Sequence, residues 1–367
     1  MAPKLVPLPK PAPKPAAAAA TQASKFPPRT PFTAADDAAA AIPGMPDARF
    51  WADSEADFNA ALPKEPGPWL VLSTGGEDGA FGAGLLNGLS AAGNRPDYSV
   101  VTGVSTGALM APFAFAGAKY DGALKDLIAK QITPGLLADV AAAYRAGRRL
   151  FVVTTDLDAE RSVVWNMGAI AVHAGDTADK ATADAALKLF RSVLLASGSI
   201  PGAFPPVLID VEGNGKHFSE MHVDGGVGGQ FFVAPPALLS PGSSYRIPAT
   251  QLYIVVNSGL EPSFTVVEQA TPTILAQAVG TAVQVDLRLL LDRTFIAAKN
   301  AGTGFNVASI SPAFNAPSRG PFDPNYMKAL FDAGYNQGKS AMPFATMPPP
   351  YPGAPAPAND SNDPAKP

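Results

Sequence analysis

The pentapeptide GVSTG, residues 103–107, sets a serine between two glycines. A short apolar run over 99–102 predicts a strand before it, and the apolar run over 106–118 predicts a helix after it. In such a strand–turn–helix setting the tight turn lifts the serine oxygen clear of the sheet, and a Cβ on either flanking residue would clash across the turn. Ser105 is therefore a candidate nucleophile, with Gly103 and Gly107 in structural roles.

A glycine-rich stretch, STGGEDGAFGAG over residues 73–84, begins at the end of a predicted strand over 69–74. Adjacent glycines let consecutive backbone N–H groups point at one oxygen. Gly75, Gly76 and Glu77 are therefore candidate oxyanion-hole donors, and Gly79 is a structural glycine. A phosphate cradle is the alternative, but the spacing does not match G-x-G-x-x-G and no Walker lysine follows.

A serine nucleophile needs a general base, and two kinds remain open. In MHVDGGVGG, Asp224 stands before Gly225 and Gly226 at the end of a predicted short strand, where its carboxylate could approach the serine. An aspartate before glycine also commonly caps its own turn. A Ser-His-Asp hydrolase would use a histidine instead. The alternatives are His217 and His222, interpreted as exposed residues that flank a hairpin turn, HFSEMH.

Taken in order, the three motifs resemble the patatin-like phospholipase family, whose members carry a glycine-rich oxyanion loop, then G-x-S-x-G, then D-G-G or D-G-A. The connecting segments LLASGSIPGAFPPV (194–207) and TTDLD (154–158) are also similar to that family. The resemblance covers roughly residues 66–341. It implies a three-layer α/β/α fold with a mainly parallel central sheet, and hydrolysis of lipid esters.

The resemblance implies that Ser105 and Asp224 form a Ser-Asp dyad that needs no histidine, cofactor or metal. Two positions depart from the family pattern. Thr74 replaces the first of three glycines, and Asp78 is acidic where plant members carry a basic residue. An acidic side chain there would disfavour a nearby oxyanion or phosphate, which also leaves open a catalytically silent lipid-binding or envelope protein.

The elements that must position these motifs alternate along the chain. Apolar runs predict strands over 150–155, 162–165 and 251–257, and helical spacing predicts helices over 85–92, 181–197 and 273–298, the last one amphipathic. Strands alternating with helices favour a largely parallel sheet covered on both faces. Apolar side chains near the motifs could line an acyl-chain groove: Leu109, Met110, Phe113, Phe115, Phe231 and Phe232.

Composition divides the chain into one hydrolase domain and two tails. Residues 1–31 form a Pro/Ala-rich arm and residues 343–367 a Pro-rich tail, both expected to be disordered. Residues 32–342 form the domain. No signal peptide or membrane-spanning helix is expected, so we expect a soluble chain, and a proline-rich arm would suit an exported or envelope-associated protein.

Charge and cysteine content restrict the partners. The net charge is −4, which argues against nucleic acid because phosphate binding needs a basic field. The chain has no cysteine, which excludes disulfides, thiolate metal sites and cysteine nucleophiles. The expected partners are a lipid or ester substrate and, through apolar contact, a membrane surface.

Overall fold

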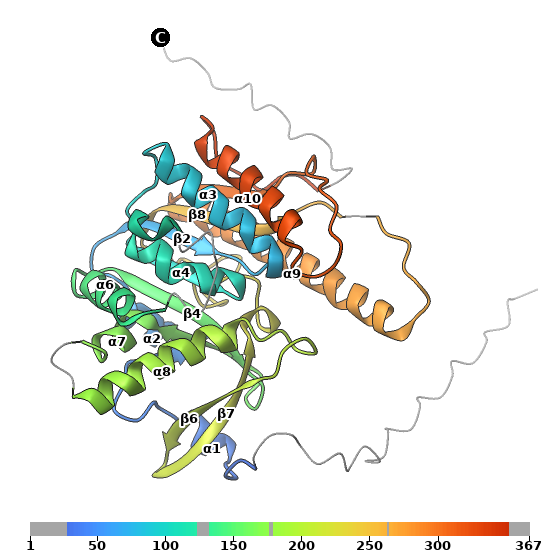
Figure 1. Cartoon of the computed structure of the whole chain (residues 1–367). Helices are drawn as coiled ribbons and strands as arrows, with labels where there is room; N and C mark the ends of the chain where they lie inside the picture. The colour runs from blue at the N-terminus through green and yellow to red at the C-terminus, as the bar shows by residue number, and fades with distance from the viewer. Residues whose placement is uncertain (1–27, 123–131, 176–178, 263, 352–367) are drawn as a thin grey trace, which may run out of the picture.

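One mixed sheet organises the residues that the computed structural model describes, 28–122, 132–175, 179–262 and 264–351 (Figure 1). Its order is β1-β5-β4-β3-β2-β8-β9, with β6 and β7 attached through β4. The strands are β1 Arg49–Trp51, β2 Gly67–Leu72, β3 Val100–Val104, β4 Arg149–Asp156, β5 Arg161–Asn166, β6 Val207–Gly213, β7 Lys216–Asp224, β8 Ala249–Gly259 and β9 Gly304–Ile310.

The centre of the sheet is parallel. β4, β3, β2, β8 and β9 pair in parallel, whereas β1, β5, β6 and β7 pair antiparallel. The predicted α/β fold with a mainly parallel central sheet is therefore confirmed. Parallel neighbours require crossover helices, which explains the alternation of strands and helices in the sequence.

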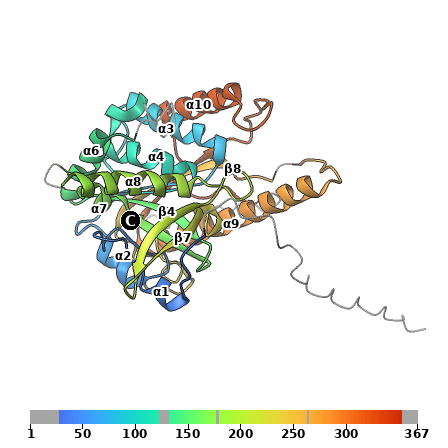
Figure 2. The same ribbon diagram turned by 60° about the horizontal axis from the view of Figure 1, so that its bottom comes forward.

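Helices cover both faces of the sheet (Figure 2). One apolar core joins the sheet to α3, α4, α6, α7, α8 and α10, and a second joins it to α2, α9 and the segment 231–239. The helices are α1 Ala34–Ala38, α2 Glu55–Ala61, α3 Gly79–Ala91, α4 Thr106–Ala116, α6 Pro134–Arg145, α7 Met167–Val172, α8 Lys180–Ser197, α9 Thr271–Ala301 and α10 Pro324–Lys339.

One edge of β4 is shared by two strands. β3 pairs with it in parallel over residues 149–153, so that Val104 lies opposite Val153. β7 then pairs with the same strand antiparallel over residues 154–156, so that Asp224 lies opposite Thr154. The carboxyl ends of β3 and β7 therefore meet on this edge.

Helices α3 and α10 pack closely through glycines. A Cβ on Gly84 would lie 2.0 Å from the carbonyl oxygen of Phe331, and one on Gly334 would lie 2.1 Å from that of Phe81. Three glycines of the glycine-rich stretch 73–84, at positions 79, 82 and 84, are residues of α3, and so is Gly88 beyond it. The helix begins at Gly79 and not near 85, and the glycine loop is correspondingly shorter than expected.

The predicted hairpin turn at HFSEMH is wrong. That segment lies within β7, and the turn between β6 and β7 falls at Asn214 and Gly215, both with positive φ. An Asn-Gly pair is the usual signal of a two-residue hairpin turn.

The folded part extends beyond the domain limits expected from composition. Arg29, within the expected arm, forms an ion pair with Asp158 at the body of the protein. Ala345, within the expected tail, exchanges both backbone hydrogen bonds with Val307 of β9. The remainder of the two expected tails, 1–27 and 352–367, lies outside the described residues.

Helix α9 is longer than expected. Within the described residues it is the one helix long and apolar enough to cross a membrane by length and composition, and only 17% of its apolar window is buried. Its C-terminal half packs on the second core through Leu287, Leu291 and Ala298. Its N-terminal half projects from the body (Figures 1 and 2).

Candidate active site

The two residues singled out as nucleophile and base lie in contact. The Ser105 hydroxyl donates a hydrogen bond of 2.6 Å to Asp224 Oδ2, although 119 positions separate the residues in sequence. Both are nearly buried, with exposed fractions of 4% and 5%. A serine hydroxyl that donates to a buried carboxylate can lose its proton to that carboxylate as it attacks an electrophile.

Ser105 occupies a strained turn between β3 and α4. Its φ of 56° and ψ of −123° are rare for a residue with a side chain and cost on the order of 1–3 kcal/mol. Both flanking glycines are sterically required. A Cβ on Gly103 would lie 2.4 Å from the Gly107 carbonyl oxygen, and one on Gly107 would lie 2.4 Å from the Leu72 carbonyl oxygen.

Ser197, the last residue of α8, holds this turn. The Ser105 amide donates to Ser197 Oγ at 3.0 Å, and the Ser197 hydroxyl donates to the carbonyl oxygen of Val153 at 2.6 Å. Ser197 thus joins the nucleophile's backbone to β4, the strand that pairs with β7 at Asp224. Ser197 lies in the segment 194–207, but the order of residues in the chain does not indicate which partners a serine contacts.

Asp224 is oriented by its own turn. Its Oδ1 accepts the Gly226 amide at 2.7 Å while Oδ2 accepts the Ser105 hydroxyl, and its amide donates to the Ser199 carbonyl oxygen at 3.0 Å. Burial raises the pKa of Asp224 to about 6, against the lowering effect of the hydrogen bonds from Ser105 and Gly226. Asp224 therefore caps its own turn through Oδ1 and contacts the serine through Oδ2.

The glycine loop wraps around the start of α4. Gly75 begins a short 3-10 turn, Gly76–Asp78, and its missing side chain admits the carbonyl oxygen of Asn257, 2.3 Å from where a Cβ would be. Gly79 similarly makes room for the Thr106 side chain. In the described part of the chain, the Gly75 and Gly76 amides donate no backbone hydrogen bond. These amides therefore remain candidate donors to an oxyanion.

Thr74, which replaces a glycine of the resembled motif, ties the glycine loop to the turn of the base. Its amide donates to the Gln230 carbonyl oxygen at 2.9 Å, and its hydroxyl donates to Gln230 Oε1 at 2.6 Å. Gln230 Nε2 in turn donates to the carbonyl oxygen of Gly226 at 2.9 Å. A Cβ on Gly226 would lie 2.8 Å from the Thr74 methyl group, so this glycine admits the threonine.

The two acidic side chains of the loop are hydrogen-bonded to the first turn of α10 and to the segment just before it. Tyr326 donates its hydroxyl to Asp78 Oδ1 at 2.8 Å, and the Phe322 amide donates to the Glu77 carboxylate. Burial raises the pKa of Asp78 to about 6. Asp78 is thus held by a tyrosine.

A cavity of about 470 Å³ borders the strand ends that carry the candidate dyad. Val104 and Val227, close in sequence to Ser105 and Asp224, line it together with Phe231 and Phe232. Three residues of α9 close another side: Asp286, Leu290 and Arg293. Of the aromatic residues expected near an acyl groove, Phe231 and Phe232 line this cavity, whereas Met110, Phe113 and Phe115 are core residues on the other side of the sheet.

The histidine alternatives do not contact the serine. His217 is exposed, as expected, and its Nε2 lies 3.7 Å from Glu212. His222 is fully buried, so the expectation of an exposed residue is wrong for it. The two positions are an odd number of residues apart on β7, and successive side chains of a strand point to opposite faces. Both ring nitrogens of His222 have partners, Thr154 Oγ1 and Glu220 Oε2, each at 3.0 Å.

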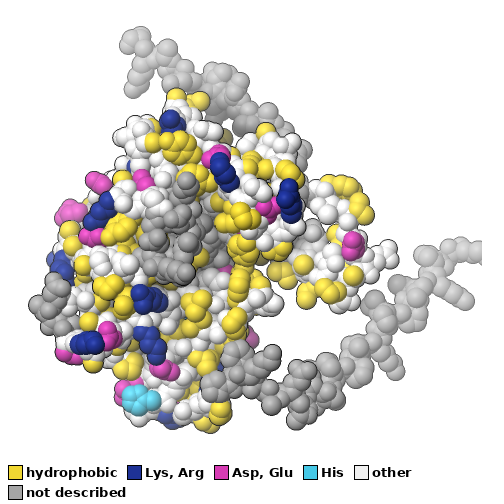
Figure 3. Space-filling view, in the orientation of Figure 1, with side chains coloured by type: hydrophobic (Ala, Val, Ile, Leu, Met, Phe, Trp, Pro, Cys, Tyr) yellow, Lys and Arg dark blue, Asp and Glu magenta, His cyan; other side chains and the backbone are white. Residues whose placement is uncertain are grey.

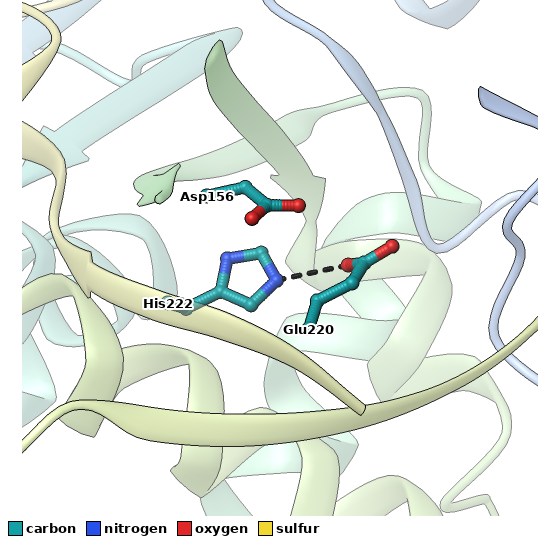
Figure 4. A group of neighbouring side chains, drawn as sticks. All are labelled: Asp156, Glu220 and His222. Carbon is teal, nitrogen blue, oxygen red and sulfur yellow. Dashed lines mark hydrogen bonds and ion pairs between the residues drawn. The ribbon is translucent and has the colours of Figure 1, made fainter. Parts of the chain in front are cut away.

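His222 belongs to a buried polar cluster with Asp156 and Glu220 (Figure 4), whose ligand-type atoms all lie within 4.8 Å of one another. Such residues can bind a divalent cation. Here Glu220 already accepts two hydrogen bonds from Arg49, so a cation would have to displace established partners. Within the described residues only Asp156 Oδ2 lacks a partner in the cluster. The arrangement suits a structural ion-pair network that anchors β7 two residues before Asp224.

Comparisons with known proteins give little beyond this geometry. No family's sequence model and no curated protein match the chain. Among solved structures, VipD from Legionella pneumophila is similar over 76% of this chain, with 11% identity and a TM-score of 0.33. The match spans 66% of that structure's chain, just under two thirds of its length. A likeness of this size carries no conclusion about activity.

Proposed function

We propose that this protein is a serine lipid acyl hydrolase, of the kind implied by its resemblance to patatin-like phospholipases, in which Ser105 is the nucleophile and Asp224 the general base. The observation that carries the proposal is the 2.6 Å hydrogen bond from the Ser105 hydroxyl to the Asp224 carboxylate. The strained turn at Ser105 supports the proposal, and we assign the amides of Gly75 and Gly76 to the oxyanion hole.

In the first step Ser105 Oγ bonds to the ester carbonyl carbon while its proton passes to Asp224. The carbonyl oxygen becomes an oxyanion, bound by the amides of the 75–77 loop. The intermediate collapses, the ester C–O bond breaks, and the protonated Asp224 gives its proton to the departing alcohol. Water then attacks the acyl carbon and loses a proton to Asp224. The bond between that carbon and Ser105 Oγ breaks, Asp224 returns the proton to Oγ, and the fatty acid leaves.

The raised pKa of Asp224 makes this chemistry feasible. A carboxylate at its ordinary pKa near 4 is a weak base toward an alcohol. At about 6 the same group is a stronger base and is still ionised at neutral pH. We place the acyl chain in the cavity lined by Phe231 and Phe232, whose volume lies within the roughly 300–1,000 Å³ usual for ligand sites.

Hydrolysis of a short p-nitrophenyl ester tests the proposal. Asp224→Asn keeps the shape of the side chain and removes the base, so we expect a rate about 10²–10⁴-fold lower. Ser105→Ala should abolish activity and labelling by a fluorophosphonate, whereas His217→Ala should leave both unchanged. An active Asp224→Asn variant would refute the dyad, and wild-type protein that neither turns over nor labels would indicate a catalytically silent protein.

A further inference from the structure

The first half of α9 carries its apolar side chains outward. Among its exposed side chains are Ile274 at 52%, Leu275 at 63% and Val279 at 55%. Figure 3 shows hydrophobic side chains on this projecting part of the molecule. A helix of a water-exposed protein normally turns its apolar stripe to the core, so this segment lacks its apolar contact.

The orientation is clear from the helical arrangement of residues 271–285. With about 100° between successive residues, one side of the helix from residue 273 onward carries only apolar side chains, namely Ile274, Leu275, Ala278, Val279, Ala282, Val283 and Val285. We call this the apolar arc of α9. The opposite side carries Thr273, Gln277, Thr281 and Gln284. Gln284 donates to the Gly259 carbonyl oxygen at 2.9 Å, which turns the polar side toward the body and the apolar arc away from it.

Charge identifies what could cover the apolar arc. No lysine or arginine occurs between Arg246 and Arg288, and no charged residue of any kind occurs between Glu268 and Asp286. A surface without cations has no electrostatic attraction for anionic lipids. We therefore expect the apolar arc to be covered by an apolar layer whose surface carries no net charge, as in a zwitterionic bilayer.

The length and width of the apolar arc favour a lipid surface over the alternatives. Its 271–285 segment extends about 22 Å and is shorter than the roughly 20 residues needed to span a bilayer, because from Leu287 onward the helix is packed on the core. A second copy of the chain would need roughly 20–30 residues a side for a stable interface, which this one helix does not offer. An apolar side about half the helix circumference wide is what an interfacial helix buries.

The projecting helix continues into one wall of the cavity that borders the ends of the strands carrying Ser105 and Asp224, although neither of these two residues lines it. Asp286, Leu290 and Arg293, on the next turns of α9, line the cavity beside Val104 and Val227. Val227 is itself 54% exposed. A surface that covers the apolar arc would therefore adjoin the turns of α9 that line the cavity.

We propose that residues 271–285 of α9 lie in the surface of a zwitterionic lipid bilayer, with the apolar arc among the acyl chains, and dock the active site at the lipid surface. The choice of a lipid occupant rests in part on the proposed function, since an acyl hydrolase of lipids meets its substrate in such a surface.

Flotation with phosphatidylcholine vesicles tests the docking. The full chain carries Ser105→Ala so that the vesicles stay intact. Leu275→Glu places a charge on the apolar arc and should lower partitioning at least about tenfold. Gln277→Glu adds the same charge to the same turn on the polar side and should leave partitioning unchanged. Because the segment has no cation, neither high salt nor added phosphatidylglycerol should change the binding of the parent chain.

Depth can be read directly because the chain has no cysteine. An environment-sensitive fluorophore on Val279→Cys should shift to the blue on addition of vesicles, and one on Gln277→Cys should not. Equal partitioning of the Leu275→Glu and parent chains would overturn the proposal. A second result would also overturn it: no vesicle binding, together with a dimer in sedimentation that Leu275→Glu dissociates. A second copy of the chain would then cover the apolar arc.

Docking and hydrolysis fail separately in this design. The Leu275→Glu variant that keeps Ser105 should hydrolyse a water-soluble p-nitrophenyl ester at the rate of the wild-type chain. Soluble-ester hydrolysis without vesicle binding would refute docking and leave the hydrolase standing. If the protein hydrolyses no ester but binds vesicles, and Leu275→Glu abolishes that binding, the result would support docking and refute the hydrolase.

Discussion

Val104 and Asp224 end their strands against consecutive residues of β4. Val104 pairs with Val153 in the parallel β3–β4 ladder, and Asp224 pairs with Thr154 in the antiparallel β4–β7 ladder. Because Ser105 follows Val104 directly, these two registers bring the hydroxyl and the carboxylate together. A slip of one residue in either ladder would turn one of them to the wrong face of the sheet.

The pH dependence of ester hydrolysis should report Asp224. The pKa of this group is raised to about 6, and only its ionised form accepts the Ser105 proton. We therefore expect kcat/KM to be constant above pH 7 and to fall about tenfold for each pH unit below 6. The measurement is a kcat/KM profile from pH 4.5 to 8 with the p-nitrophenyl ester. A profile that still rises steeply above pH 7 would argue against this carboxylate as the base.

Gly75→Ala should lower the rate of ester hydrolysis. The new Cβ would lie 2.3 Å from the Asn257 carbonyl oxygen, so the loop must move and its amides lose their alignment. Losing one oxyanion donor costs about 2.7–4 kcal/mol of transition-state stabilisation, which is about 10²–10³ in kcat. Gly259→Ala, two residues beyond Asn257 and with no heavy atom within 4 Å of the added carbon, is the matched control. Comparable kcat values for the two variants would show that the loop is not the oxyanion hole.

Ser105→Gly should be more stable than Ser105→Ala. Both lose the hydrogen bond to Asp224, but glycine accepts a φ of 56° without strain and alanine does not. We expect a difference of about 1 kcal/mol in the free energy of unfolding, measured in urea. If alanine proves equal or better, the turn stores no strain at this residue.

Asp37→Asn should stabilise the protein more at alkaline pH than at acid pH. Burial raises the pKa of Asp37 to about 7, with a further contribution from the Asp156 and Glu220 charges, against the lowering effect of Arg49. The folded chain therefore binds the proton more tightly than the unfolded chain, and stability falls as pH rises from about 4 to about 7. Asparagine removes this dependence.

The Tm of Asp37→Asn and of the wild type at pH 5 and pH 8 checks the expectation. The variant should gain at pH 8 relative to the wild type, and less at pH 5. Asp53→Asn, at an exposed carboxylate paired with Arg161, serves as the charge-matched comparison, and an equal response of the two variants would contradict the role of burial.

Sequence reasoning located the residues that local chemistry requires. Glycines at 103 and 107 are the only residues that fit the turn around Ser105, and β-strand and helix periodicity gave the alternating order of the central elements. It misjudged the glycine stretch after β2, because a glycine needed for close contact between α3 and α10 looks the same as one needed in a loop. It also misjudged His222, since the register of a strand decides which side chains are buried.

The sequence by itself determined the α/β alternation, the strained serine turn and the aspartate that ends a strand, because each depends on neighbours in the chain. Only the tertiary structure decided that β7 continues the edge of β4 where β3 stops, that Ser197 and Gln230 hold the nucleophile and the glycine loop, and that α9 turns its apolar side outward. Those relationships join residues far apart in the chain, and long-range pairing leaves no periodic trace in the sequence of either partner.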